Sequence, residues 1–201
     1  IYHCSHRRQF QLYSFSRLIR EVKPTIISME NVPQLMDFNE SSIFQDFCNE
    51  LTEMGYNYSY SVVFCPDYGI PQRRRRLVLL ASKLGEISIL PKTHTPDNYV
   101  TVRDVISSLP PIESGEICVT DPLHRARQLS PLNIKRIQAT KEGGSWRDWP
   151  DELVLDCFKK DSGRTYGSVY GRMKWNEPAP TMTTQCTGLG NGRFGHPEQD
   201  R

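Results

Sequence analysis

The stretch from Thr25 to Asn31 reads TIISMEN, a short apolar run that ends in a carboxylate and an amide. Its length and its β-branched residues favour a strand buried in a parallel sheet. Pro24 precedes the run and closes an amphipathic helix predicted from about Arg8 to Glu21. Glu30 and Asn31 therefore fall at the carboxyl end of a predicted strand, where open α/β sheets place their ligands. Position alone leaves open whether they bind a ligand or brace a loop.

The pattern downstream of this strand continues an α/β sheet. Apolar residues at helical spacing predict a helix over residues 43–51, and Gly55 stands where a C-cap glycine belongs. Residues 58–64 and 76–81 read as strands on either side of the turn-forming sequence DYGIP at residues 67–71. The order helix, strand, helix, strand, strand is typical of the closing part of an α/β sheet.

The composition of the chain changes after Leu90, where prolines and glycines repeatedly interrupt the predicted helices and strands. A helix is predicted from about Pro131 to Ala139, and the rest reads as loops and short strands of a small, irregular module. The predicted boundaries are 1–90 for a partial α/β domain, 91–190 for the irregular domain, and 191–201 for the start of a return into the first domain.

The bulk composition excludes few classes of protein. A chain of 201 residues with 37% hydrophobic side chains can build one domain, or part of a larger one plus a small module. The net charge of +2 argues neither for nor against nucleic-acid binding. Six scattered cysteines are typical of reduced thiols in the cytosol, and neither a membrane-length apolar run nor a secretory signal is recognisable. The chain starts at Ile1 and stops at Arg201 without a cap or tail, so we expect a fragment.

Four consecutive arginines, residues 73–76, are the strongest local charge in the sequence. Alternate side chains of a strand share a face, so Arg74 and Arg76 are expected to point one way and Arg73 and Arg75 the other. The pair Arg74 and Arg76 can then face a crevice. The other pair is expected to form a solvated basic edge or to meet phosphate.

Four motifs in a fixed order carry a family resemblance. Glu30-Asn31-Val32 resembles the ENV motif of the C5 cytosine-specific DNA methyltransferases, and residues 67–76 resemble the Gln-x-Arg-x-Arg motif with its usual approach. Residues 172–184 resemble the segment that closes the target-recognition region of that family, and residues 192–199 resemble the return into its catalytic domain. The resemblance implies an α/β fold: the C-terminal part of a Rossmann-like S-adenosylmethionine methyltransferase sheet, followed by a mostly loop and β target-recognition domain.

The resemblance also implies roles for individual residues. Glu30, Arg74 and Arg76 are the expected catalytic residues, with Glu30 at N3 and Arg76 at O2 of a flipped-out cytosine, and Arg74 anchoring Glu30 or a phosphate. A glutamate can accept from N4 or, when protonated, donate to N3, so the pair reads the cytosine edge and stabilises charge as a thiolate attacks C6. The residues expected to contact substrate or DNA are Asn31, Gln72, Arg172, Thr181 and Thr183.

Two parts of the family's machinery are not recognisable in this sequence. The nucleophile of the family is a cysteine that follows proline, whereas Cys65-Pro66 has the reverse order and reads as a packed thiol. The glycine-rich residues 188–192 have neither a predicted strand before them nor a helix after them, so they do not fit a cofactor loop. We therefore expect the nucleophile and most of the S-adenosylmethionine site outside this chain, and no methylation by this chain alone.

Several other residues have both a functional and a structural interpretation. No metal site is expected, because neither His3, Cys4 and His6 nor Cys118 and His124 give four ligands at zinc spacing. Trp146 and Trp149 could stack on DNA bases, but such residues more often form the core of a small module. The basic residues that could contact phosphate or simply be solvated are Lys135, Arg136, Lys141 and Arg147.

The implied partner is double-stranded DNA, with no membrane, for a protein that is monomeric at full length and cytoplasmic, at the bacterial nucleoid. The implied function is DNA cytosine-5 methylation of a short target sequence, as in restriction-modification. Two alternatives stay open: a relative that methylates tRNA, and a non-catalytic DNA-binding subunit of a split enzyme. The length of residues 91–190 favours a DNA-reading module. A Pro-Cys loop and a Phe-x-Gly-type loop upstream on the same chain would support the methyltransferase, whereas a start codon just before Ile1 would favour the split subunit.

Overall fold

The computed structural model describes residues 2–36 and 42–201, apart from the side chains of residues 2–10, 42 and 164. Its contacts separate into two compact units. The first unit comprises the described residues up to Cys65 together with Arg75–Thr93, and the second comprises Pro66–Arg74 together with His94–Arg201. The segment Pro66–Arg74 is therefore enclosed in sequence by the first unit but belongs to the second by its contacts.

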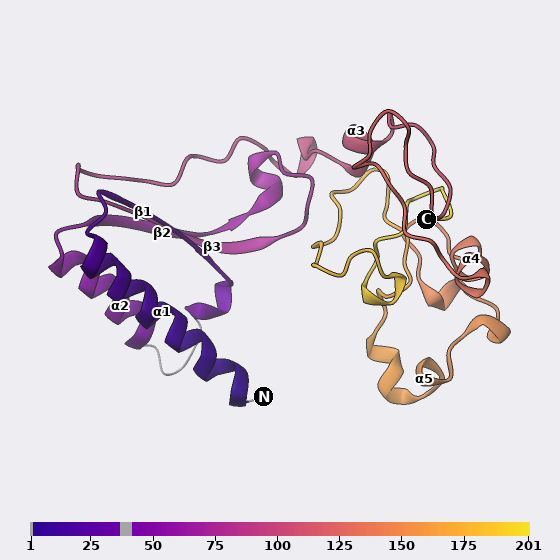
Figure 1. Ribbon diagram of the computed structural model, residues 1–201, viewed down its shortest axis with the longest axis horizontal. Coiled ribbons are helices and arrows are strands. Elements are labelled where there is room, and N and C mark those ends of the chain that lie inside the picture. Colours follow the sequence, from indigo (N-terminus) through magenta and orange to yellow (C-terminus); the bar gives the residue numbers. More distant parts are fainter. Residues whose placement is uncertain (1, 37–41) are drawn as a thin grey trace. The chain divides into compact units, whose positions relative to one another are not determined.

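The first unit is a three-stranded sheet with two helices against one face (Figure 1). The strands β1 (Ile26–Asn31), β2 (Asn57–Phe64) and β3 (Arg75–Ser82) lie in the order β1-β3-β2. The helices α1 (Tyr2–Val22) and α2 (Ser42–Glu53) lie side by side on the covered face. The predicted elements of this unit all form, and α1 begins at Tyr2 rather than near Arg8.

The pairing of the strands differs from the parallel sheet predicted for β1. β3 pairs antiparallel with both neighbours, so that Val78 lies opposite Glu30 on one side and Ser61 on the other. β1 and β2 run in the same direction with α2 between them in the chain, as in a βαβ unit, but β3 separates them. The prediction was wrong for these strands because an apolar run indicates burial and does not reveal the direction of the neighbouring strand.

The core of the first unit lies between the sheet and the helices. Ile27 and Met29 of β1 are buried, while Ser28 and Glu30 between and after them are exposed. This alternation shows that one face of β1 packs on the helices and the other does not. The remaining buried apolar residues of this core are Leu12, Ile19, Leu35, Phe44, Phe47, Cys48, Leu51, Tyr56, Leu77, Leu79 and Ala81.

Gly55 ends α2 as predicted. Its φ of +81° is in the left-handed region, which glycine adopts without steric cost. The amide of Tyr56 donates to the carbonyl of Leu51 at 2.9 Å, which is the long hydrogen bond of a Schellman motif. The C-cap directs the chain from α2 into β2, whose first residue is Asn57.

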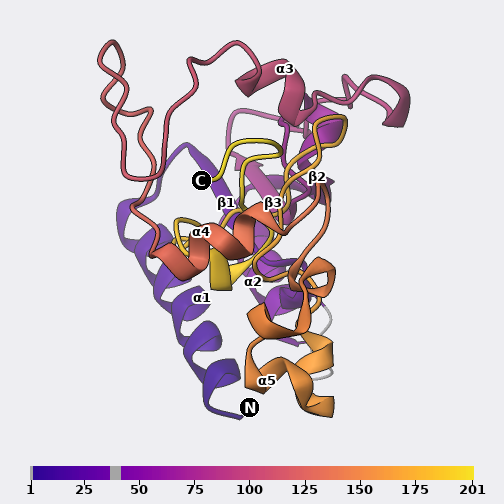
Figure 2. The ribbon, with the colours of Figure 1, turned by 90° about the vertical axis from the view of Figure 1, so that its right-hand side faces the viewer.

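The second unit consists of short helices joined by long loops (Figure 2). Its α-helices are α3 (Val102–Ile106), α4 (Pro131–Gln138) and α5 (Asp156–Lys159), and α4 confirms the predicted helix. Extended pairing among the described residues of this unit is confined to isolated bridges, so the short strands predicted there do not form. The bridges join Gln72 with Ala179, Ile117 with Arg125, and Arg172 with Gly195.

Short 3-10 turns occur in both units. They lie at Pro33–Leu35, Cys65–Tyr68, Pro96–Asn98, Trp146–Asp148, Asp151–Leu153, Asp161–Thr165 and Leu189–Asn191.

The two tryptophans singled out in the sequence are core residues of the second unit. Trp146 is 8% exposed and Trp149 is 6% exposed. Nε1 of Trp146 donates to the carbonyl of Tyr166, and Nε1 of Trp149 donates to Oγ1 of Thr140, both at 2.8 Å. Because their polar atoms are satisfied inside the unit, both act as packing anchors and are not presented for stacking on bases. The guanidinium of Arg136 lies over the Trp149 ring, 5.3 Å from its centroid.

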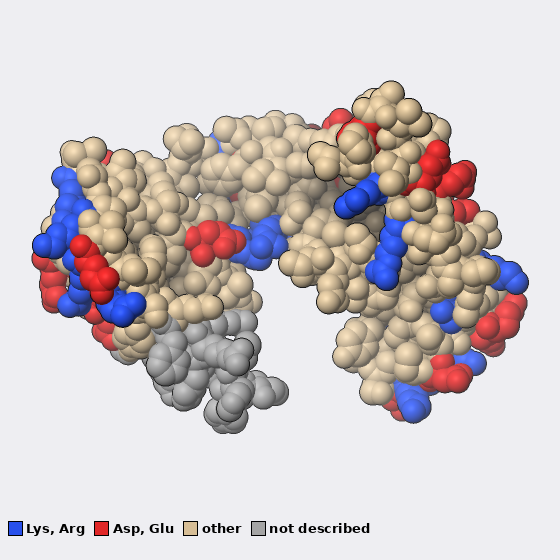
Figure 3. Space-filling view, in the orientation of Figure 1, with Lys and Arg blue, Asp and Glu red and all other residues tan. Residues whose placement is uncertain are grey.

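The charges on the surface are mixed in sign. On the face drawn in Figure 3, basic and acidic side chains share patches on both units, and much of the surface between the patches is uncharged. This distribution agrees with the net charge of +2. Within the described chain, none of the helices combines the length and the apolar character needed to cross a membrane.

Candidate functional site

Glu30 and Arg76 form an ion pair on the face of the sheet opposite the core. Glu30 lies opposite Val78 in the ladder, and Arg76 lies two positions before Val78 on β3, so all three side chains share one face. Nε of Arg76 lies 2.5 Å from Oε1 of Glu30. Nη1 of Arg76 also donates to the carbonyl of Arg75 at 2.7 Å. The register of the two strands therefore fixes the carboxylate beside the guanidinium.

The pair is open to a ligand. The side chain of Glu30 is 57% exposed and that of Arg76 is 20% exposed. An ion pair this accessible contributes only about 0–1 kcal/mol to folding. A guanidinium has more N–H donors than the two contacts of Arg76 use. A carboxylate acceptor beside such a donor suits a planar ligand whose edge carries a donor and an acceptor close together.

Asn31 serves the turn that follows β1. Its Oδ1 accepts a hydrogen bond from the amide of Val32 at 2.8 Å, and its side chain is half-buried. A 3-10 turn starts directly afterwards at Pro33. The amide therefore shapes the exit of the chain beside Glu30.

The segment before β3 is pinned to residues 179–181 inside the second unit. Gln72 forms a parallel bridge with Ala179. The amide of Arg73 donates to the carbonyl of Ala179 at 2.8 Å, and the amide of Ala179 donates to the carbonyl of Pro71 at 2.9 Å. Oγ1 of Thr181 donates to the carbonyl of Arg73 at 2.6 Å. Residues 71–73 are thus paired with residues 179–181, although the two segments are far apart in the sequence.

Arg73 is more than the solvated arginine predicted from its place in the run. Its Nη2 lies 2.9 Å from Oε2 of Glu177, and the other oxygen of that carboxylate accepts from Nζ of Lys174 at 2.6 Å. The hydrogen bond from Lys174 and the positive charges of Arg73 and Lys174 lower the pKa of Glu177. Sequence reasoning did not single out Glu177, because nothing local indicates a partner so distant in the chain.

The arginine run is divided between the two units. β3 begins at Arg75, so the alternation predicted for a strand applies to Arg75 and Arg76 and does not extend back to Arg74. Arg74 belongs to the second unit and is half-buried, with its amide donating to the carbonyl of Gln72 at 2.8 Å. Arg75 is exposed, and its guanidinium carbon lies 5.0 Å from the centroid of the Phe64 ring. Of the three predicted catalytic residues, Glu30 and Arg76 thus belong to the first unit and form an ion pair, whereas Arg74 belongs to the second unit.

Arg172 occupies an interior position that differs from the predicted contact with DNA. Its side chain is 5% exposed, and Nη2 lies 2.5 Å from Oδ1 of Asp200. The guanidinium donates to the carbonyls of Ile137, Thr140, His196 and Gln199 at distances from 2.6 to 3.2 Å. Because its donors are engaged inside the second unit, its position indicates a structural brace and gives no support to a role at the DNA. Thr183, by contrast, is exposed.

Cys48, Cys65 and the glycine-rich residues 188–192 lie in places that suit packing and turns. Burial raises the pKa of the Cys48 thiol to about 11, which suits a packed side chain. Cys65 is half-buried at the start of a 3-10 turn. The glycine-rich residues 188–192 form another 3-10 turn without a preceding strand, so they do not fit a phosphate-binding or cofactor loop.

Metal ligands do not gather in the part of the chain that the structure describes. No group of three or more His, Cys, Asp or Glu side chains is placed to hold a metal ion among those residues. The side chains of His3, Cys4 and His6 lie outside the described residues.

The comparison with protein families assigns the chain. The model of the family described as C-5 cytosine-specific DNA methylase matches residues 3–201. The chain therefore belongs to the C-5 cytosine-specific DNA methylase family.

Curated relatives agree with this assignment. The chain is 60% identical over 190 residues to the Type II methylase M.HgiDII of Herpetosiphon aurantiacus, a match that covers 94% of this chain and 54% of the relative. It is 30% identical over 194 residues to the Type II methyltransferase M1.BsuMI of Bacillus subtilis strain 168, covering 94% of this chain and 43% of the relative. The chain thus spans about half the length of these curated relatives.

A solved structure supports the fold. A protein of Escherichia coli described as a DNA modification methyltransferase encoded within a prophage matches with a TM-score of 0.62. The sequence identity is 20%, and the match covers 93% of this chain and 58% of the other. At this identity the likeness concerns the fold alone.

Proposed function

We propose that this chain is the base-recognising and DNA-reading portion of a DNA (cytosine-5-)-methyltransferase that acts on a cytosine flipped out of a short target. Membership of the C-5 cytosine-specific DNA methylase family supports the class of reaction. The single observation that carries the assignment to these residues is the Glu30–Arg76 ion pair, 2.5 Å long and held on the open face of the sheet by the β1–β3 register.

The proposed ligand of the pair is the edge of cytosine. Cytosine presents an amino donor at N4 and acceptors at N3 and O2. The carboxylate of Glu30 can accept from N4, and the guanidinium of Arg76 can donate to O2. Thymine presents an acceptor in place of the amino group, so the same carboxylate disfavours it. Atoms of the ring are out of reach inside a duplex, which is why we propose that the base is flipped out.

The second unit is the proposed DNA-reading module. Its long loops and exposed polar residues, among them Thr183, suit contacts with phosphates and base edges. We keep residues 91–190 as the proposed target-recognition domain. The proposed setting is double-stranded DNA in a bacterial cytoplasm, with a monomeric full-length enzyme.

The methyl donor and the attacking thiolate are proposed to come from sequence outside this chain. S-Adenosylmethionine is the donor that the family implies. The described residues do not fit its site, since the glycine-rich stretch 188–192 lacks the strand and helix of such a loop. We therefore derive no step through the cofactor from these residues.

The substitution Glu30→Gln in the full-length enzyme tests the proposal. Gln keeps the size of the side chain and an acceptor oxygen for N4, but it removes the negative charge that pairs with Arg76 and the carboxyl that, when protonated, can donate to N3. We expect methyl transfer to fall by about 100-fold or more, as for other groups that stabilise charge in a transition state. Affinity for the duplex should stay near the wild-type value. Glu21→Gln is the matched control, because Glu21 is also an exposed glutamate in an ion pair, with Arg17 at 3.7 Å.

The result is read from initial rates of methyl transfer and from duplex binding on the same preparations. Unchanged turnover of Glu30→Gln would refute the role of the pair. A parallel assay with tRNA separates the substrates: methylation of tRNA without methylation of duplex DNA would overturn the DNA assignment.

A further inference from the structure

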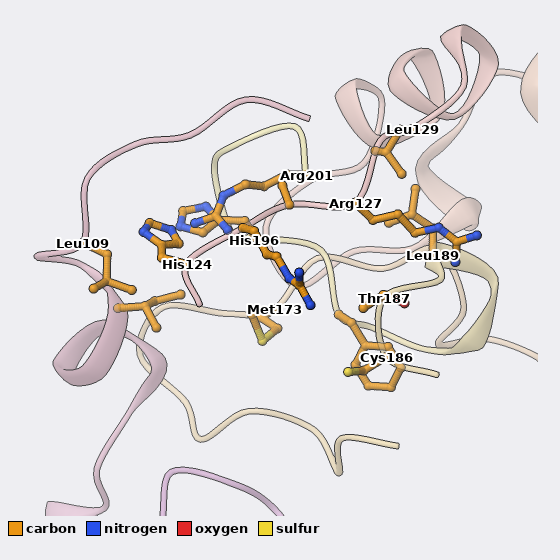
Figure 4. Close-up of a pocket in the computed structure, with 14 residues that line it drawn as sticks. Leu109, His124, Arg127, Leu129, Met173, Cys186, Thr187, Leu189, His196 and Arg201 are labelled. Atoms are coloured by element: carbon orange, nitrogen blue, oxygen red, sulfur yellow. The ribbon is translucent and has the colours of Figure 1, made fainter. Parts of the chain in front are cut away.

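A pocket of about 220 Å³ lies within the second unit, away from the Glu30–Arg76 pair in sequence (Figure 4). His124, His196 and Arg201 lie on one side of it, and Arg127 and Leu189 lie on the other. None of the described residues that line the pocket is acidic, whereas three of them are arginines. The pocket therefore presents positive charge that no lining carboxylate offsets.

The local backbone explains why two of these arginines face the same space. The amide of Cys118 donates to the carbonyl of His124, and the amide of Ala126 donates to the carbonyl of Glu116, both at 2.9 Å. Residues 124–127 are thus extended against residues 116–118. In an extended segment alternate side chains share a face, which puts Arg125 and Arg127 on one side. Both line the pocket, and both side chains are exposed.

Apart from the arginines, the lining is mainly apolar, and His124, His196 and Thr187 are its other polar side chains. Leu109, Met173 and Phe194 contribute to the walls. His124 also lines the pocket and is 9% exposed, and neither of its ring nitrogens has a hydrogen-bond partner among the described residues. A buried polar group without a partner costs about 1–3 kcal/mol. An anionic group seated in the pocket would offset the positive charge of the arginines.

We propose that the pocket binds one phosphodiester group of the DNA, with Arg125 and Arg127 as its principal ligands. The proposal rests on the proposed function, which makes DNA the substrate. A guanidinium binds a phosphate through paired N–H donors, so two guanidiniums on one face match the two free oxygens of a phosphodiester. The apolar walls at Leu109, Met173 and Phe194 suit the adjoining deoxyribose. The volume of about 220 Å³ has room for a phosphate and its sugar.

A phosphate held in this way anchors the duplex without reading its sequence. Contacts to phosphates fix the position and register of the protein, and their strength falls as salt rises because counterions are released from the DNA. The logarithm of the binding constant changes with the logarithm of the salt concentration by about 0.9 for each phosphate contact to duplex DNA. Loss of one phosphate contact can therefore be detected as a smaller slope of binding affinity against salt concentration.

The test is the double substitution Arg125→Gln and Arg127→Gln in the full-length methyltransferase. We expect weaker binding to target and non-target duplexes by the same factor, and a salt slope reduced by about 1. The matched control is Lys159→Gln with Lys160→Gln, which also removes two positive charges from exposed residues of the second unit but leaves the pocket intact. The control should keep the wild-type slope. Arg125→Lys with Arg127→Lys restores the charges and should restore most of the slope.

Each outcome supports or overturns the pocket as a phosphodiester site. A slope that falls equally in the glutamine variant and the lysine-to-glutamine control would show a general charge effect and overturn the pocket. Loss of affinity for the target duplex alone would make the arginines base readers and would also overturn it. Wild-type binding and methylation with an unchanged slope in the glutamine variant would overturn the pocket while leaving the proposed function standing. A wild-type enzyme that neither binds nor methylates duplex DNA would overturn both.

Inorganic phosphate separates a DNA site from a site for free phosphate. Thermal stabilisation of the wild type by inorganic phosphate that is lost in the glutamine variant, with no change in the DNA salt slope, would assign the pocket to the free ion and contradict the proposal.

Discussion

Glu30 is a solvent-accessible carboxylate held by one strand and faced by an arginine from the next. Its 57% exposure means that the contact with Arg76 adds little to stability. For the proposed recognition of cytosine, the arrangement supplies preorganisation, because the strand register sets the direction of both groups before the base binds. Glutamate and arginine are common on protein surfaces, and it is the β1–β3 pairing that places these two side chains together.

Arg172 shows the opposite use of a guanidinium. It is buried, and it joins carbonyls from four residues and the carboxylate of Asp200 into one network. The sequence marked Arg172 as a contact with DNA because it stands at the head of a family-like segment. A buried network of this kind cannot be predicted from one sequence, since its acceptors are backbone atoms scattered over residues 137–199.

Substitution of Arg172 by Met should destabilise the protein by about 3–5 kcal/mol, because it leaves Asp200 and several buried carbonyls without their donor. Thermal unfolding measures this loss, and Lys141→Met, at an exposed position, is the control. Arg172→Lys should recover only part of the stability, since lysine lacks the planar fork. Normal unfolding of Arg172→Met combined with weakened DNA binding would contradict the structural role and restore the one predicted from the sequence.

The elements of the first unit were largely predictable from local patterns. The apolar stretch before Glu30 forms β1, Gly55 ends α2, and the chain on either side of the DYGIP turn forms β2 and β3. Local patterns failed on how the strands are arranged. The direction of pairing depends on which strand comes to lie beside which, and hydrophobic periodicity carries no information about that choice.

The segment Pro66–Arg74 lies between two strands of the first unit in the chain but groups with the second unit by its contacts. The predicted boundary at residue 90 keeps it in one domain with its flanking strands, whereas its contacts join it to the second unit. Backbone hydrogen bonds with Ala179 and the ion pair with Glu177 hold it there. Partners so remote in sequence leave no local signal. The arginine run therefore reaches both units, and the Arg74–Arg75 peptide joins them.

At the scale of the whole molecule, His196 ties folding to pH. The pKa of His196 is lowered from 6.5 to about 4, mainly by burial and further by the nearby positive charge of Arg201. Nδ1 accepts hydrogen bonds from the amides of Glu198 and Gln199 at 3.1 and 2.9 Å, which requires that nitrogen to be unprotonated. The unfolded chain then binds the proton more readily than the folded one between these two pKa values.

We expect stability to be fully present above pH 6.5 and to decline as the pH falls towards 4, by an amount on the order of 3 kcal/mol. The decline between pH 6.5 and about 5.5 is the diagnostic part, because carboxylates with ordinary pKa values of about 4 stay mostly ionised there. Denaturant unfolding at a series of pH values measures it. His196→Asn, which keeps an acceptor but cannot titrate, should flatten the profile. An equally steep decline in that variant would assign the effect to another group.

The coupling between Glu30 and Arg76 in catalysis is the most direct measure of whether the pair recognises the base. Single-turnover rates of methyl transfer to the target cytosine are needed for the full-length wild type, Glu30→Gln, Arg76→Met and the double variant. If the two side chains hold one base edge as a unit, the double variant should be about as slow as the slower single variant, with a coupling free energy above about 1 kcal/mol. If the losses of the two single variants simply multiply in the double variant, the pair does not act as a unit and its joint recognition of cytosine is contradicted.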